Sequence, residues 1–268
     1  MTTVINQSPV FILCSGHRSG STLLQRIIIE SGEIMIWGET GGAINHLSFA
    51  YESYRQMLGP GKKKFKFGLG GNGNKQRKNF FNTELKERTH LWIPCINPSD
   101  DIAIESFRKL FDKYYGQITK EIGFSRWGFK EVKSGLFTAK FLKKLYPKGK
   151  FIFLVREPIS CMASIKRFNW MDHPEDKNAI KIYIKQWIDT AGSFRNANFG
   201  FLLRYEDLIS KNNIREKLYN YLSIKGVSEK FFKKSRPRGN VNNSMKLTYY
   251  EKYKIRKHTN KIRVDYGY

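Results

Sequence analysis

The amino-acid sequence predicts an α/β protein with an open, mostly parallel central sheet flanked by helices. Short apolar runs of strand length alternate with helical patterns, and polar motifs follow directly after most of these runs. The length of 268 residues suits one large domain, so we predict a single domain over 1–268. A Gly/Lys-rich insertion or mobile loop is expected within it at about 59–100.

The first elements are predicted from apolar spacing. The run PVFILCS at 9–15 predicts a buried strand that closes on turn residues. Four apolar side chains then recur at helical spacing, namely Leu23, Leu24, Ile27 and Ile28. Gly32 is well placed to end this helix. A short strand at 34–37 and a helix over 43–58 follow. The pattern fades from Gly59 to about Ser99, in the segment that begins GPGKKKFKFGLGG.

The second half of the chain continues the alternation. Helices are predicted over 100–123, 135–147 and 176–196, and strands over 126–132 and 150–155. Pro158 lies where the first turn of another helix begins. The segment FGFLLRYEDL at 199–208 predicts a strand that runs into a helix. In open α/β sheets ligands bind beyond the carboxyl ends of the strands. The polar motifs expected at that edge are 15–22, 38–42, 130–133, 156–164 and 204–207.

The charge of the chain is strongly positive. Lys and Arg number 48 against 23 Asp and Glu, which gives a net charge of +25. A field of this sign attracts nucleic acid, acidic glycans, anionic lipid or phosphorylated cofactors, although part of the excess reflects a general enrichment in Lys and Asn. No nucleic-acid-binding motif accompanies the basic residues, so no specific nucleic-acid partner is predicted. Peripheral contact with an anionic surface stays open.

The cysteines and the apolar runs bear on the compartment. Cys14, Cys95 and Cys161 are odd in number and lack ligand spacing, which predicts neither a disulfide framework nor a zinc site. No run approaches 18 apolar residues, so no transmembrane segment is predicted. The N-terminal apolar run is short and has no charged region before it, and we interpret it as a strand rather than a signal peptide. These features predict a cytoplasmic protein.

The stretch CSGHRSGSTLLQ, between the first strand and the first helix, has the chemistry of an anion-binding turn. Glycine-containing turns and helix N-termini offer backbone N–H groups to anions, and hydroxyls and a guanidinium add donors. A Walker A loop needs four residues between its glycines and a lysine before the hydroxyl. Here three residues separate Gly16 from Gly20, and the cation is Arg18. No later strand ends in a magnesium-binding carboxylate, so a P-loop kinase or ATPase is disfavoured.

A second anion motif follows the strand at 150–155. Arg156 leaves the end of that strand in VREPISCMAS, and Ser164 follows eight residues later, about two turns into the next helix. Together they could hold a second phosphate away from the first loop. The predicted ligand therefore carries two well-separated anionic groups.

Three segments in order resemble the sulfotransferases that use 3′-phosphoadenosine-5′-phosphosulfate (PAPS). SGHRSGSTLL resembles their 5′-phosphosulfate loop, REPISCMAS resembles their 3′-phosphate motif, and RYEDL at 204–208 resembles a segment whose tyrosine lies near the adenine. The resemblance covers about residues 9–210. Within the family, the sequence is most similar to tyrosyl-protein, carbohydrate and bacterial sulfotransferases. It implies a P-loop NTPase-like sulfotransferase fold and PAPS as the donor, with no metal.

The resemblance also implies roles for residues at matching positions. The residues implied to hold the 5′-phosphosulfate are Arg18, Ser19, Gly20, Ser21 and Thr22. Arg156 and Ser164 would hold the 3′-phosphate, and Tyr205 would pack by the adenine. A loosely matching late loop, SRPRGN, would close the 3′-phosphate through Arg238 and Gly239. Arg18 stands where the family more often has lysine, so electrostatic support rather than proton donation is expected of it.

Sulfuryl transfer to a hydroxyl needs a base and support for spreading negative charge. Glu39, in WGETGG, matches a glutamate of the tyrosyl-protein and several bacterial enzymes and is the predicted base, although a carboxylate here could simply satisfy helix amides. His46 is the alternative, since cytosolic members of the family use histidine. Lys130, in WGFKEVK, resembles a lysine near the transferring group and is predicted to support the reaction.

The predicted activity is transfer of a sulfuryl group from PAPS to a hydroxyl, on a glycan or another polar acceptor. The basic insertion could guide an acidic glycan or could be a solvated loop, and tyrosine peptides, lipids and phenols stay open. The competing hypothesis is a nucleotide- or polyanion-binding protein of the same fold without catalysis. The intact donor motifs and Glu39 argue against it.

Overall fold

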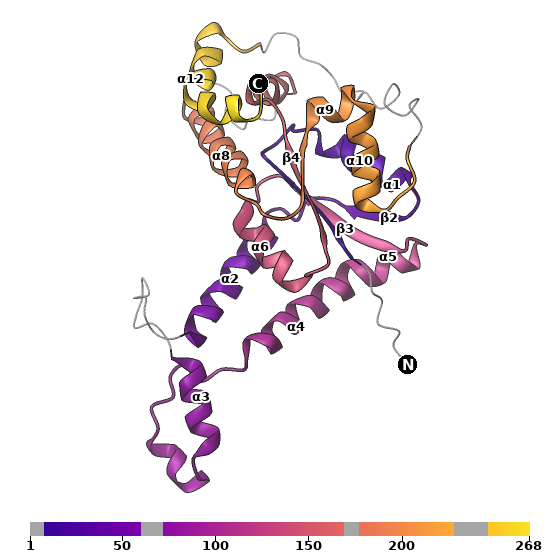
Figure 1. Ribbon diagram of the computed structural model, residues 1–268. Coiled ribbons are helices and arrows are strands. Elements are labelled where there is room, and N and C mark those ends of the chain that lie inside the picture. The colour runs from indigo at the N-terminus through magenta and orange to yellow at the C-terminus, as the bar shows by residue number, and fades with distance from the viewer. Residues whose placement is uncertain (1–7, 60–71, 169–176, 228–245) are drawn as a thin grey trace. The chain divides into compact units, whose positions relative to one another are not determined.

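The structure, a computed structural model, describes residues 8–59, 72–168, 177–227 and 246–268 (Figure 1). The chain divides into two compact units. The first comprises Met1–Gly42 with Tyr114–Tyr268, and the second is Ala43–Lys113. Within the described ranges, no helix combines the length and apolar character needed to cross a bilayer.

The first unit is built on a five-stranded sheet in which every pair of neighbouring strands is parallel. The strands are β1 (Val10–Cys14), β2 (Ile34–Trp37), β3 (Arg126–Glu131), β4 (Lys150–Val155) and β5 (Phe201–Arg204). Their order is β2-β3-β1-β4-β5. The predicted open parallel sheet is therefore confirmed, and the polar motifs that follow the strands share its carboxyl edge.

The strand order reverses next to β1. From β1 the chain passes through α1 (Ser21–Glu30) to β2 on one side of the sheet, whereas from β4 it passes through α7 (Pro158–Arg167) and α8 (Lys177–Arg195) to β5 on the other side. The loops after β1 and β4, which are neighbouring strands, consequently diverge. Such a topological switch point is where open α/β sheets bind their ligands.

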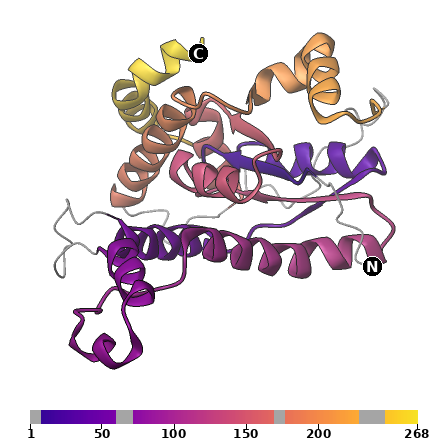
Figure 2. The ribbon, with the colours of Figure 1, turned by 60° about the horizontal axis from the view of Figure 1, so that its bottom comes forward.

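The remaining helices of this unit are α5 (Ile118–Glu121), α6 (Leu136–Leu145), α9 (Tyr205–Ser210), α10 (Asn212–Leu222) and α12 (Tyr249–Asp265). The helices α1, α6, α7 and α8 lie where the sequence predicted them, whereas α12 was not predicted. Pro158 occupies the first turn of α7, as predicted, and Gly32 follows α1 with a left-handed φ of 75°. The C-terminal helix α12 lies beside α8 (Figures 1 and 2).

The alternation of side chains along the strands gives the two faces of the sheet different cores. One face is aliphatic: Val10 and Ile12 of β1 pack in a fully buried cluster with residues of α1 and α10 such as Ile27 and Leu218. The other face is aromatic, with Phe11 in contact with Phe129 and Phe151 at 5.1 Å between ring centroids. On that face Phe153 packs on Phe194 of α8 at 4.8 Å. The strand β1, which leads into the polar loop, is therefore fully buried between the two layers.

The second unit is helical. It contains α2 (Ala43–Leu58), α3 (Gly73–Asn82), the 3-10 helix η1 (Leu85–His90) and α4 (Asp100–Phe111). The Tyr51 hydroxyl donates to Asp100 at 2.8 Å, which joins α2 to α4. Residues 73–90 are thus largely helical, where the fading pattern predicted an insertion without regular structure. Gln76 Oε1 accepts from the Cys95 backbone N–H at 2.8 Å, a long-range contact that fixes α3 despite its polar sequence.

The helix predicted over 100–123 is not continuous α-helix. A six-residue π-helical segment, Asp112–Gln117, follows α4 and precedes α5. Gly116 in this segment lies so close to the Trp127 indole that a Cβ would come within 3.1 Å of Nε1. Apolar periodicity could not indicate this change of hydrogen bonding, because it arises from packing on β3.

Candidate active site

The loop after β1 has a backbone shaped for close approach. Gly16, Arg18 and Gly20 have φ values of 151°, 59° and 93°, so three of its residues depart from ordinary extended or helical backbone. Arg18 adopts the left-handed region although it has a side chain, which costs free energy. The loop ends at the N-terminus of α1, where the first amide groups have no intrahelical acceptor. This is the backbone of an anion cradle.

Gly20 is required by its neighbour Tyr205, the first residue of α9. A Cβ on Gly20 would lie 2.1 Å from Tyr205 Cδ2 and 2.4 Å from Cε2. The ring of Tyr205 is thereby held directly against the loop, which brings the third family-like segment to the first.

Replacing Gly20 by Ala is expected to lower the thermal midpoint and to weaken nucleotide binding at least tenfold. The methyl group overlaps the Tyr205 ring, and the left-handed backbone adds about 1–2 kcal/mol of strain. Differential scanning fluorimetry and titration calorimetry check this. Gly32→Ala is the matched control, because Gly32 shares a positive φ of 75° but meets no atom within 4 Å. Equal effects of both substitutions on binding would contradict the contact's importance.

The two predicted phosphate motifs meet through their arginines. Arg18 Nε donates to Ser164 Oγ at 3.0 Å, and Arg156 Nη1 donates to the Arg18 carbonyl at 2.9 Å. The Arg18 guanidinium lies over the Phe168 ring at 4.3 Å, and that of Arg156 lies over Tyr205 at the same distance. The sequence predicts a ligand with two well-separated anionic groups. In the structure the Arg18 side chain lies at the second motif, through its hydrogen bond to Ser164 and its contact with Phe168.

The arginine pair creates a local excess of positive charge. Burial, and next the charge of Arg156, lower the pKa of Arg18, as expected for two cations held close together in a partly dry site. Five buried side-chain atoms lack a hydrogen-bond partner in the described part of the chain, and three of them, Ser15 Oγ, Ser19 Oγ and Arg156 Nε, belong to the two motifs. Unpaired buried donors are costly, and an anionic ligand would satisfy them. The residues present therefore fit a phosphorylated ligand.

A second cluster lies at the ends of β2 and β3. Lys130 Nζ is 2.5 Å from Glu39 Oε1. The Lys130 side chain is only 8% exposed, whereas that of Glu39 is 37% exposed. Since Lys130 bonds Oε1, the second carboxylate oxygen of Glu39 can accept a proton from a molecule that approaches from solvent. Sequence reasoning predicted both residues, and the structure brings them together.

Glu131, which sequence reasoning did not single out, holds the residue next to Glu39. The residue is 2% exposed, and its carboxylate accepts from the Thr40 backbone N–H at 3.0 Å, the Thr40 hydroxyl at 2.5 Å and the Val132 N–H at 3.0 Å. Lys130 and Glu131 of β3 thus bond Glu39 and Thr40, respectively, in the loop after β2. A glutamate beside the predicted lysine was the only sequence signal for this arrangement.

Thr40→Val is expected to reduce turnover about tenfold while nucleotide affinity stays unchanged. Valine keeps the shape and the backbone hydrogen bond but removes a hydroxyl bond to a buried carboxylate, worth about 1.5–3 kcal/mol. Steady-state kinetics and calorimetry measure the two effects. Thr40→Ser, which retains the hydroxyl, serves as the control. Wild-type turnover of the valine variant would show that the hydroxyl does not position Glu39.

His17 is a further polar residue of the site that sequence reasoning passed over. It stands between Gly16 and Arg18 and is half-buried. Burial, and next the positive charge of Lys133, lower its pKa, so the imidazole is neutral near pH 7. His17 is part of the loop CSGHRSGSTLLQ, but the glycines and Arg18 carry the anion-binding pattern there.

The other predicted residues are placed as follows. Ser19 and Ser21 are buried in the loop and first turn of α1, and Thr22 is exposed. Burial raises the pKa of the neighbouring Cys14 to about 12, so its thiol stays protonated. His46 lies on α2 in the second unit, and its role as an alternative base stays a prediction. Arg238 and Gly239 lie outside the described residues.

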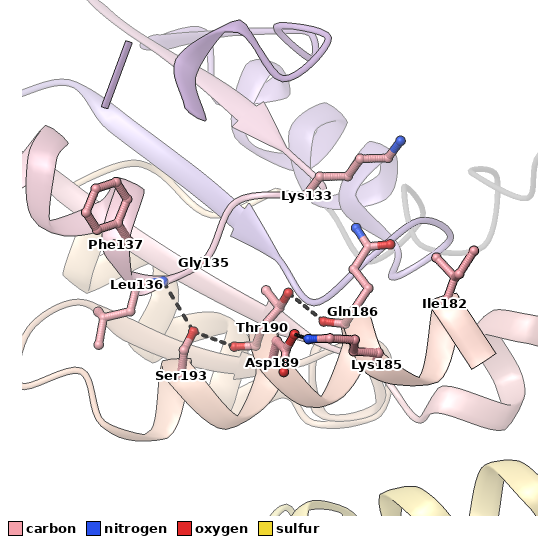
Figure 3. A pocket seen from close by; sticks show the side chains of 10 residues that line it. All are labelled: Lys133, Gly135, Leu136, Phe137, Ile182, Lys185, Gln186, Asp189, Thr190 and Ser193. Carbon is pink, nitrogen blue, oxygen red and sulfur yellow. Dashed lines mark hydrogen bonds and ion pairs between the residues drawn. The ribbon is translucent and has the colours of Figure 1, made fainter. Parts of the chain in front are cut away.

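A pocket of about 540 Å³ opens between the start of α6 and α8 (Figure 3). Lys133, Leu136 and Phe137 line one side, and α8 lines the other. Ser193 accepts from the Leu136 N–H and donates to the Thr190 carbonyl, so the hydroxyl of Ser193 is already engaged. Within the described ranges no three His, Cys, Asp or Glu side chains are grouped to hold a metal ion.

Comparison with known proteins supports one family. A model of the sulfotransferase family matches residues 9–227. The sulfotransferase domain from the Synechococcus PCC 7002 olefin synthase has a similar fold, with a TM-score of 0.50 and 16% identity over 98% of this chain and 96% of that one. Sulfotransferase STF9 from Mycobacterium avium aligns with a TM-score of 0.50 and 13% identity, over 97% and 77% of the respective chains. No curated protein sequence matches significantly.

The matched range contains the sheet, the loop after β1, the Glu39–Lys130 pair and the motif after β4. It covers well over half of the chain, and the structures with a similar fold carry the same description. The chain belongs to the sulfotransferase family.

Proposed function

We propose that this protein transfers a sulfuryl group from PAPS to a hydroxyl group of an acceptor. The observation that carries the proposal is the convergence of Arg18 and Arg156 at the switch point, with a buried Nε of Arg156 that lacks a protein partner in the described part of the chain. Two guanidinium groups are suited to a nucleotide with more than one anionic group, because each offers a planar fork of donors.

The donor-binding residues divide by position. Arg156 and Ser164 would hold the 3′-phosphate, and Tyr205 would pack beside the adenine. The loop amides together with Ser19, Gly20, Ser21 and Thr22 would hold the 5′-phosphosulfate. Arg18, which contacts Ser164, would lie between the two anionic ends and offset negative charge on the departing phosphate. PAPS supplies an activated sulfuryl group on a phosphate that leaves readily, so this assignment needs no metal.

Glu39 and Lys130 would serve the acceptor. The exposed carboxylate of Glu39 accepts the hydroxyl proton as the acceptor oxygen bonds to sulfur and the bond from sulfur to the 5′-phosphate oxygen breaks. The products are a sulfate ester and adenosine-3′,5′-bisphosphate. Lys130, buried and paired with Glu39, keeps the carboxylate oriented and adds positive charge where negative charge spreads. Thr40 and Glu131 hold this arrangement.

Transfer of ³⁵S from labelled PAPS to a panel of acceptors tests the proposal. The panel contains neutral and acidic glycans, tyrosine peptides, hydroxylated lipids and small phenols. We expect label in at least one hydroxyl acceptor and stoichiometric formation of adenosine-3′,5′-bisphosphate. Failure to bind this bisphosphate, together with no transfer to any acceptor, would contradict the proposed function.

A further inference from the structure

The C-terminal helix α12 separates its charges between two faces. Its sequence contains two acidic residues, and both face neighbouring helices. Glu251 accepts from Lys166 of α7 at 2.8 and 3.0 Å, and Asp265 pairs with Arg195 of α8. Lys166 and Glu251 side chains are only 11% and 14% exposed. Both carboxylates of α12 therefore form ion pairs with the helices against which α12 packs.

The exposed side of α12 is predominantly positive. Its exposed cationic residues are Lys252, Arg256, Lys257 and Lys261. A rise of 1.5 Å per residue spreads them over ~14 Å along the helix axis. Asp265, four residues after Lys261, pairs with Arg195 of α8, so the exposed side of the helix is predominantly positive and lacks the alternating charges of an ordinary solvated helix.

Aromatic rings are interleaved with these cations. Tyr249, Tyr250 and Tyr253 are 87%, 62% and 51% exposed. Lys254 lies over the Tyr250 ring at 4.6 Å, and Lys257 lies over Tyr253 at 5.9 Å. Such contacts restrict the lysine side chains and so reduce the entropy lost on binding. Exposed tyrosines also offer flat surfaces with a hydroxyl donor, which suit sugar rings.

The side of α12 that packs against α7 contacts the helix that carries part of the proposed donor site. Arg263 of α12 bonds Glu157, whose side chain caps the N-terminus of α7 by accepting from the Ser160 N–H. Ser164 lies on the same helix α7 and contacts Arg18. The helix α12 is thus fixed to the helix that carries the 3′-phosphate motif.

We propose that the exposed cations and tyrosines of α12, here called the α12 strip, bind an acidic polysaccharide that serves as the acceptor. This inference rests on the proposed function, because only an acceptor must bring free hydroxyls. An acidic polysaccharide supplies anionic groups, sugar rings and hydroxyls along one chain. Duplex DNA has its sugar hydroxyls esterified except at the ends, and lipid insertion needs an apolar face, whereas Val264 is the one exposed aliphatic residue of this helix.

Binding to heparin, as the probe polysaccharide, tests the α12 strip. One variant reverses four charges: Lys252→Glu, Arg256→Glu, Lys257→Glu and Lys261→Glu. The matched control reverses four exposed lysines elsewhere: Lys120→Glu, Lys140→Glu, Lys148→Glu and Lys217→Glu. Both have the same net charge. We expect the α12 variant to lose at least about 30-fold in heparin affinity and to show a weaker salt dependence, and the control to lose less than about threefold.

The test also includes nucleotide binding, a second α12 variant and two other anionic ligands. Both variants should bind adenosine-3′,5′-bisphosphate with the affinity of the wild-type protein. If the wild-type protein itself does not bind this nucleotide, the result contradicts the proposed function and not the role of the α12 strip. A second α12 variant with four glutamines, checked by circular dichroism, replaces the first if charge reversal unfolds the helix. Equal losses in the α12 and control variants would overturn the proposal. So would tighter binding of the strip to duplex DNA, or to phosphatidylcholine–phosphatidylserine vesicles, than to heparin at the same salt concentration.

Discussion

Glu39→Gln is expected to lower turnover about 10²- to 10⁴-fold without changing the affinity for adenosine-3′,5′-bisphosphate more than about twofold. Glutamine has nearly the same size and can still accept from Lys130, so the local geometry survives while the base is removed. The loss should appear in kcat, because Glu39 is assigned to the acceptor proton and not to the donor. Steady-state ³⁵S transfer and calorimetry on the same preparation measure both quantities.

His46→Ala is the comparison that separates the two predicted bases. His46 lies on α2, so its removal should leave turnover within about threefold of wild type if Glu39 is the base. Full turnover of Glu39→Gln combined with loss of turnover in His46→Ala would transfer the role to His46. A large loss in both variants would mean that the two residues act on the same proton, and the assignment of a single base would be wrong.

Arg156→Ala is expected to weaken adenosine-3′,5′-bisphosphate binding about 10- to 100-fold and AMP binding much less. The substitution removes a guanidinium that would bond the 3′-phosphate, an interaction to a charged group worth about 1.5–3 kcal/mol, and AMP lacks that phosphate. It also removes the bond to the Arg18 carbonyl that holds the loop after β1. Calorimetric titration of both nucleotides gives the discrimination ratio.

Arg195→Ala is the control for removing an arginine. Arg195 is a partly exposed residue of α8 that pairs with Asp265, so nucleotide affinity should stay within about twofold. If Arg156→Ala weakened both nucleotides equally, the arginine would be a general support for the loop after β1 and not a ligand of the 3′-phosphate. Arg156→Lys, which keeps the charge but loses the fork, should lie between the two extremes.

Much of the parallel sheet could be predicted from short-range pattern. The strands at 34–37 and 150–155 have the same bounds in the structure as in the sequence prediction, because apolar runs bounded by turn residues are a local signal. The helices α3 and α12 gave no such signal. The described side chains of α12 are mostly exposed, with Ile255 and Thr259 as its buried residues, so its sequence has little apolar periodicity. Its ion pairs with α7 and α8 join residues far apart in the chain and give no local signal either.

In the candidate site, too, some contacts could be predicted from the sequence and others could not. The strand ends placed Glu39 and Lys130 at one edge of the sheet, and their contact follows from the parallel pairing of β2 with β3, in which Trp37 lies opposite Phe129. The hydrogen bond from Arg18 to Ser164 could not be predicted, because it joins residues 146 positions apart through side-chain conformation. Glu131 was equally hidden, since a buried carboxylate is recognised by its partners and not by its sequence neighbours.

Thermal melting with adenosine-3′,5′-bisphosphate and with AMP tests the central claim most directly. The claim is that Arg18, Arg156 and the loop after β1 form a site for a nucleotide with anionic groups at both ends. At equal concentrations well above the dissociation constant, the bisphosphate should raise the melting temperature by several degrees and AMP should raise it far less. Equal shifts with both nucleotides, or no shift with either, would contradict the claim.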